Sequence, residues 1–192
     1  MELTLDERLD LIKNHLATCE QKDPIAIVKS LMHCDFVNIH GPEHHFLDGA
    51  SLMRALHNAG VKFDYDKAIE ELCARTRKMP GAMCGYWGMC GSVASIGAVL
   101  SIIDGTGPLS DDQNYKNHMS FTSSMINKMS EIGGPRCCKR NAFLSILAGV
   151  EYAKEHYGVN PDVPKDLKCE FSPHNKQCIG TACPFFKTDK RE

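Results

Sequence analysis

Apolar residues recur along most of the chain at the three- and four-residue spacing of a helix face. Leu5, Leu9, Ile12 and Leu16 begin the pattern, and a second short stripe follows Asp23 and Pro24. The same period predicts helices over residues 43–58, 64–77, 86–103, 110–129 and 135–157. Strand-like alternation of useful length is absent from the sequence, so we expect a mainly α, single-domain helical bundle.

The last thirty or so residues differ from the body. From residue 161 onward prolines, charged residues and three cysteines replace the apolar period. With 192 residues the chain fits one domain. We therefore predict one domain over residues 1–192, with a helical body over 1–160 and an irregular cysteine-rich tail over 161–192 that binds metal.

Ten cysteines need an explanation, because a domain of this size buries a core without disulfides. The acidic, amphipathic start MELTLDERLD is not a signal peptide, and the longest mostly apolar run, residues 92–103, is too short for a membrane span. We expect a cytoplasmic protein, in which cysteines are more often metal ligands or catalytic groups. A net charge of −2 without a long basic block argues against a nucleic-acid partner.

Three Pro/Gly breaks are each followed by histidine or cysteine: HGPEHH over residues 40–45, PGAMCGYWGMCG over 80–91 and GGPRCCKR over 133–140. Free N–H groups at a helix start favour thiolate over thiol. We predict that the three starts converge in space. Six helical positions separate two side chains by about 120°, so Cys84 and Cys90 share a centre only if Cys84 lies in a loop. The alternative is that both cysteines are buried packing residues.

The third break holds two adjacent cysteines among basic residues. Neighbours on a helix point in different directions, so one of Cys137 and Cys138 is expected to be a ligand or nucleophile while the other packs or resolves it. Arg136, with Lys139 and Arg140, supplies positive charge that lowers a thiol pKa or holds an anionic group. The alternative is a solvated basic face beside a buried cysteine pair.

Residues 33–45 contain four histidines, one cysteine and two acidic residues. Glu43 and His44 suit proton transfer at a helix start, and His45 is a candidate metal ligand. Each histidine is equally well an ordinary polar residue. The spacing does not match the helix pattern of zinc proteases.

In the tail, Cys169, His174, Cys178 and Cys183 offer three thiolates and an imidazole. This set suits tetrahedral zinc, while three cysteines with an outside ligand suit an iron–sulfur cluster such as [4Fe–4S]. Spacing alone leaves both open.

Four blocks in order, namely HGPEHH, PGAMCGYWGMCG, GGPRCCKR and CEFSPHNKQCIGTACPFF, resemble an uncharacterised domain family of anaerobic bacteria and archaea. That family occurs alone or fused to radical S-adenosylmethionine proteins, and no function is assigned to it. The resemblance implies an anaerobic setting and iron–sulfur or thiol chemistry. The chain lacks the three-cysteine radical motif, so a radical S-adenosylmethionine partner would act in trans.

The leading hypothesis is an iron–sulfur protein of anaerobic redox or sulfur metabolism. We expect Cys84, Cys90 and Cys137 or Cys138 to bind metal around one centre, and Cys169, Cys178 and Cys183 to bind it at the same or a second centre. His44 and the candidate ligand His45 would complete or flank the site. Arg136 would hold an anionic group. Two alternatives stay open: a zinc-stabilised binding or scaffold module without chemistry, and a thiol-dependent transferase with Cys138 as nucleophile.

Overall fold

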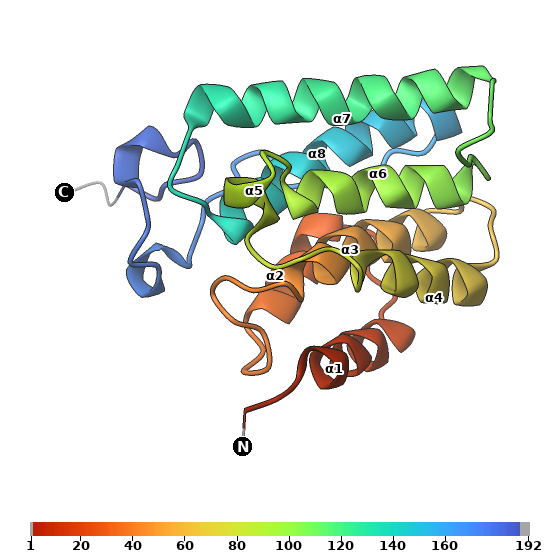
Figure 1. Cartoon of the computed structure of the whole chain (residues 1–192). Coiled ribbons are helices and arrows are strands. Elements are labelled where there is room, and N and C mark those ends of the chain that lie inside the picture. Colours follow the sequence, from red (N-terminus) through yellow and green to blue (C-terminus); the bar gives the residue numbers. More distant parts are fainter. Residues whose placement is uncertain (1, 189–192) are drawn as a thin grey trace.

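The computed structural model describes residues 2–188 and contains eight α-helices in one compact body, which confirms the predicted fold class (Figure 1). The helices are α1 (Leu5–Ala17), α2 (Pro24–Met32), α3 (His44–Asn58), α4 (Tyr65–Thr76), α5 (Met83–Tyr86), α6 (Gly91–Ile103), α7 (Gln113–Ile132) and α8 (Cys138–Tyr157), with single 3₁₀ turns at Ser172–His174 and Gly180–Ala182. Within the described part of the chain, no helix is long and apolar enough to cross a membrane.

Helices α3 and α6 form the centre of the bundle. Helix α3 packs against α1, α2, α4, α6 and α8, and α6 also packs against α4, α7 and α8. In Figure 1 these two helices lie between α7 on one side and α1 on the other. They approach closely at Gly49, whose N–H donates to Ser95 Oγ at 3.1 Å. The helix starts that carry the cysteines and histidines are therefore held by the best-packed pair in the fold.

The predicted helix starts agree with the capping chemistry. Thr4 forms a reciprocal capping box with Glu7, and the side chains of Asp23, Asp64 and Asp112 accept N–H groups from the first turns of α2, α4 and α7. These short-range hydrogen bonds depend only on neighbouring residues, which is why the sequence reveals them.

The predicted single helix over residues 86–103 is wrong. The chain instead forms the one-turn helix α5, then a break in which Gly88 has a φ of 67°, and α6 starts only after Cys90. The apolar period does not register this break, because glycine permits the left-handed backbone without changing the spacing of apolar residues.

The predicted start of the last helix at residue 135 is also wrong. Helix α8 begins at Cys138, and its N-cap is Cys137, whose Sγ accepts the N–H of Arg140 at 3.4 Å. A thiol is not among the usual capping groups, so the sequence does not mark this boundary. The shift makes Cys137 the N-cap of α8 and not a residue of its first turn.

The cysteine-rich tail folds back onto the end of the bundle where α8 begins (Figure 1). Within the tail, the N–H of Cys169 donates to Phe185 O at 2.7 Å and joins the two ends of the segment. The tail contacts the body through the edge of Phe185 on the Phe143 ring and an ion pair between Glu170 and Lys29. Leu167, Phe171 and Phe185 are buried in the hydrophobic core, so apolar side chains also anchor the tail to the body.

Replacing Gly49 tests the close approach of α3 and α6. A Cβ atom there would lie 2.3 Å from Ser95 Oγ and 3.2 Å from the Ser95 carbonyl oxygen. We expect Gly49→Ala to lower the free energy of unfolding by about 1–3 kcal/mol in urea denaturation, because overpacking outweighs the gain in helix propensity. Gly107→Ala is the control, since nothing lies within 4 Å of its added Cβ. Unchanged stability of Gly49→Ala would contradict this packing.

Candidate metal centre and adjoining cavity

The three predicted helix starts meet at one end of the bundle. The ring of His45 fills the space beside Gly91, where an added Cβ would lie 2.2 Å from its Cδ2 atom. At the start of α8, Lys139 Nζ lies 3.2 Å from His44 Nε2. Asn141 Nδ2, one turn into α8, donates to Cys90 Sγ at 3.2 Å. These contacts confirm the predicted convergence.

Four cysteines line one narrow cavity between the tail and the start of α8: Cys137, Cys169, Cys178 and Cys183. The three tail cysteines were predicted together, and Cys137 joins them rather than Cys84 and Cys90. His174, the fourth tail candidate, lies on a different surface, in a shallow pocket beside His33. The structure thus brings together an all-thiol set.

Hydrogen-bond donors contact two of these sulfurs, those of Cys137 and Cys178. Besides the N–H of Arg140, Cys137 Sγ lies 3.5 Å from Asn175 Nδ2. Cys178 Sγ accepts the N–H of Gly180 at 3.4 Å. Donors of this kind stabilise a thiolate, the form that binds metal.

The other two cysteines, Cys169 and Cys183, each have a backbone N–H group that favours the thiolate. Burial raises the pKa of Cys169, and the backbone N–H of Phe171 opposes that rise. Burial likewise raises the pKa of Cys183, against the N–H of Phe185. In both, the donor stands two residues after the cysteine, as Gly180 does after Cys178. The neighbouring thiols also raise both pKa values, so a cation among them would relieve their mutual repulsion.

The thiol cavity is small, with a volume of about 20 Å³. Over residues 2–188, no three His, Cys, Asp or Glu side chains are arranged to hold a single metal ion in the conformation described. Metal binding would therefore require the thiols to adjust their positions.

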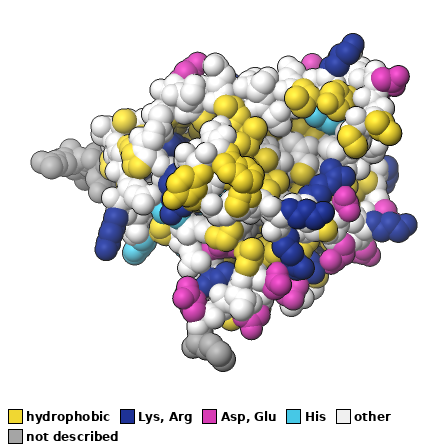
Figure 2. Space-filling model, in the orientation of Figure 1, with side chains coloured by type: hydrophobic (Ala, Val, Ile, Leu, Met, Phe, Trp, Pro, Cys, Tyr) yellow, Lys and Arg dark blue, Asp and Glu magenta, His cyan; other side chains and the backbone are white. Residues whose placement is uncertain are grey.

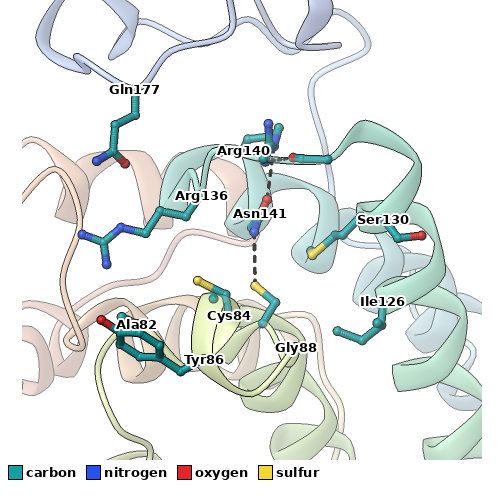
Figure 3. Close-up of a pocket in the computed structure, with 15 residues that line it drawn as sticks. Ala82, Cys84, Tyr86, Gly88, Ile126, Ser130, Arg136, Arg140, Asn141 and Gln177 are labelled. Atoms are coloured by element: carbon teal, nitrogen blue, oxygen red, sulfur yellow. Dashed lines mark hydrogen bonds between the residues drawn. The ribbon is translucent and has the colours of Figure 1, made fainter.

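A larger, open cavity of about 680 Å³ adjoins the first one (Figure 3). Cys84 and Cys90 line it together with Arg136, Arg140 and Asn141. Contrary to the geometric expectation, Cys84 lies within the short helix α5 and Cys90 is the N-cap of α6. The break between the two helices still allows both sulfurs to face one space.

Of the two cysteines that line the open cavity, Cys90 is the one with hydrogen-bond donors around its sulfur. Burial raises its pKa, while Asn141 Nδ2 and the backbone N–H groups of Ser92 and Val93 act in the opposite direction. The N–H groups belong to the first turn of α6, whose dipole also favours negative charge. A Cys90 thiolate would therefore be stabilised by the hydrogen bond from Asn141 and by the nearby N–H groups of Ser92 and Val93.

Arg140 and Asn141 connect the two cavities. Arg140 lines both of them, and its Nε–H donates to Asn141 Oδ1 at 3.2 Å. Asn141 in turn donates to Cys90, so one hydrogen-bonded chain runs from the thiol cavity to the open one (Figure 3). Asn141 could not be identified from the sequence, because an asparagine inside a helix has no distinctive spacing.

The predicted acid–base pair lies inside the protein. Glu43 and His44 are each 1% exposed, and neither lines the thiol cavity or the open cavity. Glu43 Oε1 accepts the N–H of Asn38 at 2.8 Å. His44 Nε2 lies 3.0 Å from the carbonyl oxygen of Asn38. Both side chains hold the preceding loop and do not reach a substrate in this conformation.

A charged group, Asp48, sits deeper in the same region. It is 0% exposed, its Oδ1 lies 3.7 Å from His44 Nδ1, and neither oxygen accepts a hydrogen bond from the described residues. Burial lowers the pKa of Lys139, and Asp48 opposes that shift. Burial also lowers the pKa of His45, which favours a neutral imidazole. The start of α3, with His44, His45 and Asp48, thus forms a buried polar wall with Lys139 behind the cysteines.

Cys138 occupies the least favourable position for a nucleophile. Burial, together with the negative charge of Asp48, raises its pKa to about 12. It lines neither cavity. Its neighbours Cys137 and Arg136 face the tail and the open cavity instead, so the adjacent cysteines do have different surroundings, as predicted.

Residues 12–186 match the family of unknown function DUF5714. The chain belongs to this family. The match includes every block from HGPEHH to CPFF, so the thiol cavity and the open cavity both lie within the DUF5714 region. No curated protein and no solved structure matches the chain.

Thiol alkylation tests the placement of Cys138. In the folded protein at pH 8 we expect iodoacetamide to modify Cys84, which lines the open cavity, and to leave Cys138 unmodified. With a pKa of about 12, only roughly one Cys138 in ten thousand is a thiolate at that pH, and its reactivity should rise with pH up to about 12. Peptide mass spectrometry reads each site, with urea-unfolded protein as control. Modification of Cys138 as fast as Cys84 would instead support the transferase hypothesis.

Proposed function

We propose that this DUF5714 protein is a cysteine-ligated metalloprotein, and that its centre is an iron–sulfur cluster on Cys137, Cys169, Cys178 and Cys183. One observation carries the proposal: four thiols from two segments of the chain line one cavity. The N–H groups of Arg140 and Gly180 donate to Cys137 and Cys178, and those of Phe171 and Phe185 oppose the rise in the pKa of Cys169 and Cys183. Four thiolates are the usual ligand set of [2Fe–2S] and [4Fe–4S] clusters.

The surroundings of the cavity favour a redox role over a purely structural one. Hydrogen bonds to the sulfurs and nearby charge set the reduction potential of such a centre. Arg140 supplies that charge and connects the thiol cavity through Asn141 to Cys90. The proposed centre therefore stands beside a second thiol that faces an open cavity, as a redox or sulfur-transfer reaction requires.

Zinc is the second candidate, and the small volume of the thiol cavity favours it. A cavity of about 20 Å³ needs little change to hold one ion, whereas a cluster needs the thiols to move apart. A zinc site with four cysteines is closed and structural. In that case the protein would be a zinc-stabilised binding module.

We also propose a cytoplasmic radical S-adenosylmethionine protein as partner, acting in trans. The support is the resemblance of the four sequence blocks together with an exposed apolar surface beside the open cavity. Tyr86 and Trp87 are 82% and 67% exposed, and Met89 adjoins them. Figure 2 shows hydrophobic side chains gathered left of centre, where Figure 1 has α5. Such a patch beside a cavity is typical of a protein-binding surface.

Metal analysis after anaerobic purification tests the proposal. We expect iron and acid-labile sulfide in comparable amounts, visible absorption that bleaches on reduction, and little zinc. Cys178→Ser should lose most of the metal because it removes one of four ligands. Cys34→Ser should keep it, since Cys34 lies outside both cavities and contacts the carbonyl oxygen of Ser30.

Three outcomes would overturn or change the proposed cluster. Colourless protein with one zinc per chain, lost in Cys178→Ser, would overturn the cluster in favour of the zinc module. Metal retained in Cys178→Ser but lost in Cys90→Ser would move the centre to the open cavity. Absence of both metals after anaerobic work would contradict the proposal altogether.

A further inference from the structure

The open cavity has the size and shape of a ligand site that the proposed metal centre does not use. Its volume of about 680 Å³ lies within the range of roughly 300–1,000 Å³ that is typical of small-molecule sites. Its walls come from α5 and the following break, the end of α7, the start of α8 and the tail. Four separate segments thus enclose it.

The charge on its walls has one sign. Arg136 and Arg140 both line the cavity, and none of the described residues that line it is acidic. Within residues 2–188 no carboxylate lies at ion-pair distance from either guanidinium. Arg140 is 4% exposed. Its Nε and Nη2 atoms donate to Asn141 Oδ1 and to the carbonyl oxygens of Gly133 and Pro135, and its Nη1 atom alone has no hydrogen-bond partner among these residues. Two guanidinium groups without a counter-charge favour an anionic group.

The opposite side of the cavity is apolar. Ile126 and Met129 of α7 line this side, while the Tyr86 ring lies on the Arg136 side (Figure 3). Asn141 and Gln177 add amide groups at the basic side (Figure 3). A ligand that fits both sides therefore carries an anionic group at one end and an apolar or aromatic portion at the other.

The sulfurs of Cys84 and Cys90 lie in the wall between these two sides. A molecule bound across the cavity would cover both thiols. Their reactivity therefore reports whether the cavity is occupied.

We propose that this cavity is a binding site for a small organic anion, with Arg136 and Arg140 holding a carboxylate or phosphate group and the α7 side holding an apolar portion. The site shares Arg140 with the four-thiol cavity but none of its four cysteines, and it does not depend on which metal binds there. A molecule bound there would lie against the thiols of Cys84 and Cys90.

Protection from N-ethylmaleimide tests the site in the protein as purified. We expect 3-phenylpropionate and phenyl phosphate to slow labelling of Cys84 and Cys90, and the neutral 3-phenylpropanamide to need an at least about tenfold higher concentration. The ratio between the two anions tells a carboxylate ligand from a phosphate ligand. Cys34, outside the cavity, should label at the same rate throughout.

Arg136→Gln should remove most of this preference for anions, whereas Arg77→Gln, which changes an arginine that pairs with Asp6 and does not line the cavity, should not. The metal content of each variant is measured in parallel, so loss of the metal and loss of anion binding are read separately. Equal protection by the anions and the amide, no protection by either anion at millimolar concentration, or an unchanged preference in Arg136→Gln would overturn the proposal.

Discussion

The first turn of α8 is the constraint on which the site depends. Successive helical residues point about 100° apart, so this turn distributes its side chains to three neighbours. Cys137 faces the tail cysteines, Lys139 enters the buried wall beside His44, and Asn141 reaches Cys90. Because these contacts share one rigid turn, a change in any of the three surroundings is transmitted to the others through the position of α8.

The buried wall has an electrostatic consequence. Asp48 and Lys139 are almost completely buried. They do not form a direct ion pair with each other in the described structure. Charges in such a place cost folding free energy unless they interact with further charge. Burial raises the pKa of Cys138, Asp48 adds to that rise, and Lys139 opposes it. Burial and Asp48 therefore keep Cys138 protonated, whereas at Cys90 the nearby donors oppose the rise in pKa that burial and Asp48 cause.

Much of the fold was predictable because its signals are local. The helical period and the aspartate caps depend on neighbours a few residues apart, and both gave correct elements. The two misplaced boundaries lie where no such signal exists: Gly88 bends the chain without altering the apolar spacing, and Cys137 caps α8 with a thiol.

The site was predictable in part for the same reason. Each cysteine stands out by its residue type, and the helix starts do converge. Which cysteines lie together depends on tertiary contacts that sequence spacing does not contain. Cys137 lies beside Cys169 because the tail folds back. Glu43 is buried because the first turns of α3 are covered by the rest of the fold. Asn141 and Asn175, which contact the cysteines, carry no sequence signal at all.

X-ray absorption spectroscopy of the anaerobically purified protein tests the four-thiol centre most directly, because it reports the ligand atoms of the metal independently of its amount. The account predicts coordination by sulfur alone, with metal–sulfur distances of about 2.3 Å if the metal is zinc and additional metal–metal scattering if it is a cluster. Imidazole nitrogen in the coordination shell would contradict it, because the four side chains assigned as ligands are all cysteines.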